Sequence, residues 1–182
     1  MPQTHELSLT LKASTLEKEP VKFSLKASAD DKIRLVERFG LVSLQSLTAE
    51  VMVRNKGAGN GLLVSGQLKA ALVQRCTITL ADVPEELDVA FDLLLVDPEM
   101  ANRMDEEESY LDPDAPDYDA LEGDTVDVGE IVAQTLSVWM NPYPRAEGAK
   151  VIAPTNPNVS LNEPELEKPN PFAALSKLQD KS

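Results

Sequence analysis

The sequence predicts an α+β fold, in which an antiparallel β-sheet, strongly curled or barrel-like, is accompanied by two main helices, an acidic loop and an extended C-terminal tail. Three observations carry this prediction. Apolar and polar residues alternate with a period of two over most of the first half of the chain, as in strands with one buried face. Two segments have apolar residues at helical spacing and are long enough to pack on such a sheet as helices. The composition, with 42% hydrophobic and 26% charged residues, is that of a globular protein.

Two short strands are predicted near the N-terminus. Each alternates apolar with polar residues: Leu7, Leu9 and Leu11 in the first, and Val21, Phe23 and Leu25 in the second. A short helix follows, for which Ser28 is the expected N-cap and Asp31, three residues later, the acid of a capping box. Its apolar positions recur at helical spacing, and a glycine suits its end: Ile33, Val36, Phe39 and Gly40.

Three longer strand segments come next. The first is followed by a turn rich in Gly and Asn, residues 55–61, which predicts a hairpin. The second, residues 62–80, has apolar residues at even positions. At ~3.3 Å per residue it is too long for one straight strand in a small domain, so we expect a bend near Gly66 or Gln74. The inward residues of the first and third segments are Leu47, Ala49, Val51 and Val53, and Leu87, Val89, Phe91, Leu93 and Leu95.

A second helix is predicted from Val128 to about Met140. Asp127 and Glu130 have the spacing of a capping box, and Pro142 stops the helix. One helical face carries Val128, Ile131, Val132, Thr135, Leu136 and Trp139. We expect this face to pack on the open face of the sheet, with Trp139 as a core anchor.

The chain is expected to form a single α+β domain over residues 1–150, with an acidic loop inserted at residues 97–123. Residues 151–182 are predicted to be a Pro-rich linker and a short C-terminal helical motif. In this motif Asn170 is the N-cap, Pro171 the first helical residue, and Phe172, Leu175 and Leu178 share one face. So short a helix is unstable alone in water, so it either folds back on the domain or docks on a partner.

The charge is strongly negative and unevenly placed. There are 17 Lys and Arg against 31 Asp and Glu, a net charge of -14, and the segment from Asp105 to Glu130 holds twelve carboxylates with no Lys or Arg. Such a protein repels the phosphate backbone, which argues against autonomous binding of RNA or DNA. The acidic segment is either a solvated insertion or an electrostatic lure for a basic protein. The candidate partner-binding residues are Asp105, Glu106, Glu107, Glu108, Asp124, Asp127 and Glu130, and in the tail Asn170, Pro171, Phe172, Leu175 and Leu178.

Residues suited to catalysis or metal binding are scarce. His5 is the only histidine and Cys76 the only cysteine, so neither a zinc site nor a histidine-activated nucleophile is expected. Cys76 falls on the apolar side of its strand, which is typical of a buried small hydrophobe. The loop carboxylates allow at most incidental binding of divalent ions. We expect no catalytic residues, no metal site and no cofactor, with a carboxylate-dependent metal hydrolase as the less favoured alternative.

The chain is expected to be cytoplasmic. No apolar run approaches the ~18 residues that cross a membrane. The N-terminus lacks the cationic and apolar regions of a signal peptide. A lone cysteine excludes disulfides within the chain, which fits a reducing compartment.

Several blocks of the sequence are distinctive in combination. They are residues 39–47, residues 64–80, Leu-Glu-Gly-Asp-Thr-Val-Asp-Val-Gly-Glu at 121–130, Asn-Pro-Tyr-Pro-Arg at 141–145, and Asn-Pro-Phe-Ala-Ala-Leu at 170–175. Together, and in this order, they resemble the YceD family of large ribosomal RNA subunit accumulation proteins. Many members carry a Cys-x-x-Cys pair near the central strand. Here Val73 and Thr79 flank Cys76 at that spacing, so any metal role of the pair would not transfer.

The resemblance implies a bacterial, non-enzymatic ribosome biogenesis factor required for accumulation or processing of large-subunit (23S) ribosomal RNA. Taken with the net charge of -14, this role favours a ribosomal protein or a large-subunit assembly factor as the partner, and no membrane or DNA partner is expected. Direct contact with rRNA stays open, since Lys69, Arg75 and Arg103 could form a local basic patch. An acidic binding module or chaperone for a basic protein is the alternative function.

Overall fold

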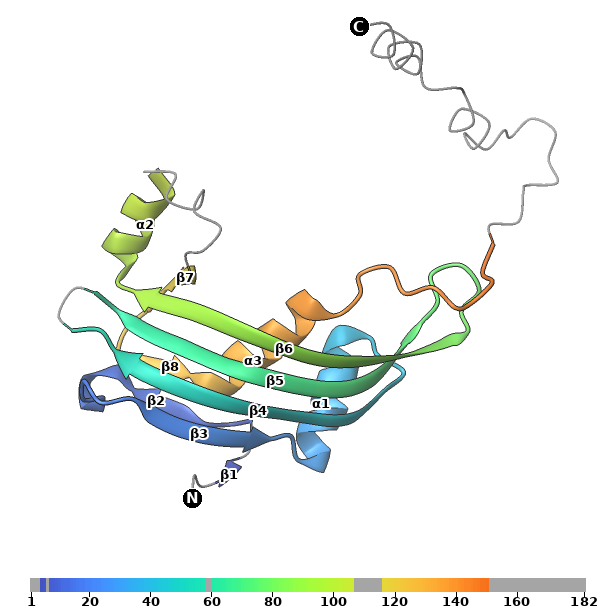
Figure 1. The fold of residues 1–182 in the computed structure, drawn as a ribbon, viewed down its shortest axis with the longest axis horizontal. Coiled ribbons are helices and arrows are strands. Elements are labelled where there is room, and N and C mark those ends of the chain that lie inside the picture. Colours follow the sequence, from blue (N-terminus) through green and yellow to red (C-terminus); the bar gives the residue numbers. More distant parts are fainter. Residues whose placement is uncertain (1–3, 6, 58–59, 107–115, 151–182) are drawn as a thin grey trace, which may run out of the picture. The chain divides into compact units, whose positions relative to one another are not determined.

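The computed structural model describes residues 4–5, 7–57, 60–106 and 116–150 (Figure 1). The chain divides into two compact units, residues 1–147 and 148–182. All the elements below belong to the first unit. The predicted tail motif, Asn170 to Leu178, lies outside the described residues.

Six strands form one open sheet in the order β1-β3-β4-β5-β6-β7. The neighbours β3–β4, β4–β5 and β5–β6 are antiparallel, whereas the outer pairs β1–β3 and β6–β7 are parallel. A small second sheet pairs β2 with β8 in antiparallel fashion. The strands are β1 (Thr4–His5), β2 (Thr10–Lys12), β3 (Val21–Lys26), β4 (Ser43–Asn55), β5 (Leu62–Arg75), β6 (Asp82–Val96), β7 (Asp117–Ala120) and β8 (Thr125–Asp127).

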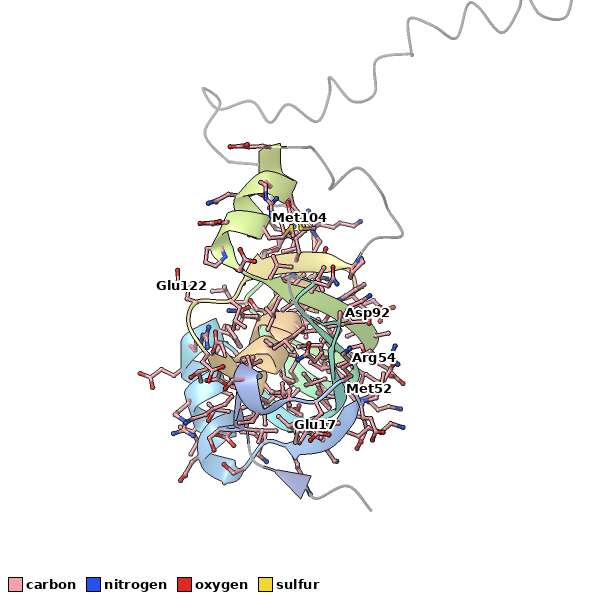
Figure 2. All side chains as sticks on the ribbon, turned by 90° about the vertical axis from the view of Figure 1, so that its left-hand side faces the viewer. Glu17, Met52, Arg54, Asp92, Met104 and Glu122 are labelled. Atoms are coloured by element: carbon pink, nitrogen blue, oxygen red, sulfur yellow. The ribbon has the colours of Figure 1, made fainter. Side chains whose placement is uncertain are left out.

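Three α-helices and one 3-10 turn complete the described fold. They are the turn η1 (Ala13–Thr15) and the helices α1 (Ala29–Phe39), α2 (Pro98–Glu106) and α3 (Val128–Trp139). The helices α1 and α3 lie on one face of the sheet (Figure 1). Figure 2 shows Met52, Arg54 and Asp92 projecting from the opposite side of the sheet. We call the face covered by α1 and α3 the inner face.

The α+β class is confirmed, but the prediction of a strongly curled or barrel-like sheet is wrong. The sheet stays open because its outermost strands, β1 and β7, are two and four residues long and pair only with their inner neighbours. The expected bend near Gly66 or Gln74 is replaced by a hairpin turn. The strand β5 ends at Arg75, and residues 76–81 reverse the chain into β6, so that no strand of nineteen residues needs to curve.

The turn at residues 76–81 has none of the usual turn residues. It is closed by backbone hydrogen bonds from Cys76 N to Ala81 O (2.8 Å) and from Leu80 N to Cys76 O (3.0 Å). Leu80 adopts a left-handed conformation with φ of 61°. Because a branched apolar side chain rarely takes this conformation, the sequence pattern carries no sign of the turn.

The core lies between the inner face and the two helices. The predicted inward residues of β4, from Leu47 to Val53, are buried, and the hairpin predicted at residues 55–61 joins β4 to β5. The inner residues of β6 are less enclosed, since Leu87, Val89, Phe91 and Leu93 are only partly buried. The sheet is therefore well covered over β4 and β5 and thinly covered over β6.

Two residues predicted to lie on apolar helix faces are exposed instead. The buried positions of α1 are Asp31 and Leu35, one turn apart, which places Ile33 on the outside with 66% of its surface exposed. The buried face of α3 centres on Val132 and Leu136 and continues to Met140. Trp139 stands to one side, 52% exposed, so its predicted role as a core anchor is wrong.

The segment expected to be an acidic loop, residues 97–123, contains regular structure in its described part. The helix α2 and the strand β7 both fall within it, and β7 extends the main sheet beside the end of β6. The prediction of two main helices therefore omitted α2. High local charge and the absence of a long apolar stripe concealed a helix of only nine residues.

The predicted capping box of α1 is confirmed. The Asp31 amide donates to Ser28 Oγ (3.2 Å), and the Ser28 amide donates to Asp31 Oδ2 (3.0 Å). Arg34 also donates to Asp31 Oδ1 (2.6 Å), although only 5% of Asp31 is exposed. Burial raises the pKa of Asp31, but the hydrogen bonds from Ser28 and Arg34 outweigh it and lower the pKa to about 2.

The substitution Asp31→Asn should lower the free energy of unfolding at neutral pH by about 2 kcal/mol, since a pKa shift from 3.8 to about 2 favours the folded, ionised state. The folded-state pKa is depressed, so this stabilisation is present above pH 4 and is lost as the pH falls toward 2. Urea unfolding at a series of pH values measures both effects. Asp30→Asn, an exposed change in the same helical turn, is the matched control. Equal losses of unfolding free energy in the two variants would show that the hydrogen bonds of Asp31 are not the source of the stabilisation.

Candidate functional site

The block Asp-Val-Gly-Glu at residues 127–130 begins α3 and contacts the N-terminal segment. The Val128 amide donates to Leu9 O (3.0 Å), which prolongs the pairing of β2 with β8. Gly129 lies so close to the backbone of Leu7 that a Cβ at this position would overlap the Leu7 carbonyl oxygen. Only glycine permits this approach of helix to strand backbone.

The two carboxylates of the block also have intramolecular partners. Asp127 caps α3 by accepting a hydrogen bond from the Glu130 amide (2.9 Å). The Glu130 side chain does not return to Asp127, as a complete capping box requires, but accepts two hydrogen bonds from Arg38 of α1 (2.6 and 2.7 Å). The Arg38 guanidinium lowers the pKa of Glu130, and Glu130 in turn raises the pKa of Arg38. The block thus ties α3 to both α1 and the N-terminal segment.

A hollow of about 400 Å³ lies beside this contact. Its charged lining consists of Asp31, Arg34, Arg38, Asp127 and Glu130, and Ser8 is also at its wall. Each of these charged side chains is engaged in the hydrogen bonds already described, and the two cations each face a carboxylate. The charged lining of the hollow is therefore a set of paired charges, in which no carboxylate is left uncommitted as a general base.

The remaining candidate carboxylates are divided between two places. Asp124 accepts hydrogen bonds from the hydroxyl (2.6 Å) and amide (2.7 Å) of Ser14, which lower its pKa. Asp105 and Glu106 are at the end of α2, where the Tyr118 hydroxyl donates to Asp105 Oδ1 (2.5 Å). Glu107 and Glu108 lie outside the described residues. The structure brings Asp127 and Glu130 together but places Asp105 and Glu106 on a different element.

The acidic part of the protein extends further than the segment from Asp105 to Glu130. Residues 76–130 hold nineteen carboxylates and one arginine, whereas residues 1–75 hold eleven Lys and Arg and seven carboxylates. Since β5 ends at residue 75, the sign of the charge changes across the sheet between β5 and β6. The five carboxylates of β6 belong to the acidic side: Asp82, Glu85, Glu86, Asp88 and Asp92.

The three cations considered as a basic patch are not gathered. On β5, Lys69 contacts Asp88 (3.0 Å) and Arg75 contacts Asp82 (3.8 Å), both across to β6. Arg103 lies on α2, where it contacts Met100 Sδ (3.7 Å). Lys69 and Arg75 therefore face carboxylates of the acidic side.

Cys76 is buried, as predicted, but in the hairpin turn and not within a strand. None of its surface is exposed, and its sulfur accepts hydrogen bonds from the amides of Ile78 (3.4 Å) and Thr79 (3.3 Å). Hydrogen bonding from the Ala146 backbone and from Thr79 lowers the pKa of Cys76 to about 6, against the effect of burial. The Thr77 amide donates to Pro144 O (2.9 Å). Residues 74–80 and 141–145 thus meet at this turn and hold it in place.

The described residues define an α+β protein whose exposed chemistry is an acidic surface. Within them, no three His, Cys, Asp or Glu side chains are grouped so as to hold a metal ion. Among the helices of the described ranges, none has the length and apolar character required to span a membrane.

The model of one family, described as "Large ribosomal RNA subunit accumulation protein YceD", matches residues 64–179. This span is more than half of the chain, so the chain belongs to the YceD family, as its sequence blocks had indicated. Four of the five blocks fall within the match, while residues 39–47 precede it. Searches of curated proteins and of solved structures found no match.

The substitution Gly129→Ala should lower the free energy of unfolding by about 2–3 kcal/mol, because the added methyl group must displace the Leu7 backbone from α3. Ser137→Ala, an exposed change on the same helix, controls for helix propensity and should leave stability within about 0.5 kcal/mol. Chemical denaturation with far-UV circular dichroism measures both. A Gly129→Ala protein as stable as the control would show that this contact does not position α3.

Proposed function

We propose that this chain is a non-enzymatic, cytoplasmic factor required for accumulation or processing of large-subunit (23S) ribosomal RNA, and that it acts through a basic protein partner. The observation that carries the proposal is its membership of a family described as large ribosomal RNA subunit accumulation proteins. The partner would be a ribosomal protein or an assembly factor of the large subunit.

The distribution of charge supports a protein as the direct partner. A net charge of -14 opposes contact with phosphates, and the cations Lys69 and Arg75 are already paired with carboxylates. A protein that binds rRNA is itself basic, so an acidic surface attracts it over several ångströms and raises the rate of encounter. Bound there, the basic protein would be shielded from premature contact with RNA.

The C-terminal motif is proposed as a second point of contact. Asn170 and Pro171 suit a helix start, and Phe172, Leu175 and Leu178 would form one apolar stripe. A short amphipathic helix of this kind gains stability when its apolar stripe enters a groove on another protein. The acidic surface would then provide attraction and the motif would provide apolar contact.

Cells depleted of this protein should have a reduced ratio of large- to small-subunit rRNA, measured by electrophoresis of total RNA. Supplying the wild-type protein should restore the ratio, whereas a version ending at Pro169 should not. The shortened protein should keep the melting temperature of the full chain. An unchanged ratio after depletion would refute the role in rRNA accumulation, and a large fall in melting temperature would assign the tail to the folded core.

Amide substitutions at residues 106–108 should weaken binding to the basic partner and flatten its dependence on salt. The test variant is Glu106→Gln/Glu107→Gln/Glu108→Gln, and the partner is identified by screening purified large-subunit ribosomal proteins one by one. Glu17→Gln/Glu19→Gln/Glu37→Gln removes the same charge at exposed positions outside the acidic segment and is the control. We expect about a tenfold loss of affinity at low salt for the test variant only. Equal effects would indicate that net charge alone governs binding.

A further inference from the structure

We propose that the free edge of β6 binds an extended, basic segment of the partner protein, which adds a strand to the sheet. This inference rests on the proposed function, because it names the part of a basic partner that is bound and the place where it binds. The strand β7 pairs with β6 only from Leu93 to Val96. Between Asp82 and Asp92, no other described strand lies on that side of β6.

The accessible stretch of this edge is Glu86–Asp92. Toward the hairpin turn, Pro84 removes one backbone donor, and the Glu85 side chain accepts a hydrogen bond from the Asn141 amide (3.1 Å). Toward the other end, β7 occupies the edge. In between, every second residue directs its backbone N–H and C=O away from β5, as at any sheet edge. This seven-residue stretch matches the length of an ordinary strand.

The inner side of this edge has an uncovered apolar groove. A shallow cavity of about 130 Å³ lies between β6 and α3. Its apolar lining is Phe91, Leu93, Ile131, Val138 and Trp139, and Gln134 and Thr135 of α3 are also at its wall. Val138 is 79% exposed, and Trp139 is also largely open to solvent. A strand added to β6 would direct alternate side chains toward this groove, where apolar ones would cover Phe91 and Trp139.

The outer side of the same edge is acidic. Glu86, Asp88 and Asp92 alternate with the apolar residues and point to the opposite face, while Asp117 of β7 is at the wall of the groove. The strand β6 contains no Lys or Arg. The other side chains of an added strand would lie beside these carboxylates, so Lys and Arg are favoured there. The edge therefore fits a segment that alternates apolar and basic residues.

The same charges disfavour two other occupants. A second copy of this chain, paired through its own β6, would bring carboxylates of one sign opposite one another on the outer face. An RNA strand would bring phosphates against the same carboxylates. The parallel pairing of β7 shows that this edge of β6 accepts a strand.

The full chain can be tested with a synthetic peptide of about eight residues that alternates Val and Lys. Trp139 is the only tryptophan, so its fluorescence reports directly on the groove. The peptide should shift the emission to shorter wavelength and slow hydrogen exchange at alternate amides of Glu86–Asp92. A peptide alternating Val and Glu should have neither effect, and the Val-Lys peptide N-methylated at alternate residues should lose both.

A charge-reversal pair of variants provides the specificity test. Glu86→Lys/Asp92→Lys should weaken binding of the Val-Lys peptide by about tenfold and allow binding of the Val-Glu peptide. Glu17→Lys/Glu122→Lys makes the same change of net charge, and Figure 2 shows Glu17 and Glu122 apart from Asp92. This control should bind the Val-Lys peptide nearly as the wild type does.

Three outcomes would each overturn the proposed strand addition. The first is exchange protection confined to another element, and the second is peptide binding that survives N-methylation. The third is an equal loss of affinity for the Val-Lys peptide in both double variants. A change of mass in solution to that of a dimer, with protection of β6 in the absence of peptide, would assign the edge to a second copy and also overturn it. These outcomes are distinct from failure of the proposed function, which is judged by the rRNA ratio in cells. A protein that restores the ratio but does not bind the peptide at β6 refutes this inference alone.

Discussion

The close approach of α3 to the N-terminal segment determines how the helical side of this fold is placed. Gly129 allows the first turn of α3 to lie against the Leu7 carbonyl, and the Val128 amide bonds to Leu9. The position of the helix is then fixed along the sheet, so that Val132 and Leu136 reach the residues of β4 and β5 in the core. The bidentate contact between Arg38 and Glu130 adds α1 to the same junction. A block that distinguishes this family in sequence thus acts on the packing of three separate segments.

The strands could be predicted from the sequence wherever burial on one face imposes a period of two. The inward residues of β4 and the capping box of α1 follow from such local rules. The hairpin turn at residues 76–81 could not, because Leu80 adopts a left-handed conformation that local preference disfavours. Trp139 was misplaced for another reason. Helical spacing gives the direction of a side chain, but how far the sheet extends beneath the helix depends on tertiary structure.

The candidate site was predictable in its charge but not in its extent. Counting carboxylates along the chain identifies the acidic segment after residue 105. The count does not show which carboxylates have partners within the fold: Asp124 is hydrogen-bonded to Ser14, whereas Glu86 lies beside an open strand edge. The order of strands in the sheet makes this distinction. By placing β6 next to β7, it joins the carboxylates of a strand to those of the acidic segment and forms a single acidic side.

An open strand edge next to an apolar groove normally favours aggregation, and charged side chains are a common protection. On β6 all the charges have one sign, so the protection is selective. Carboxylates opposite carboxylates cost free energy, whereas carboxylates opposite Lys or Arg gain it. The side chains that keep one copy of β6 from pairing with another are therefore the ones that make the edge receptive to a basic segment. For this reason the unpaired edge and the acidic charge, each ambiguous alone, together indicate one kind of partner.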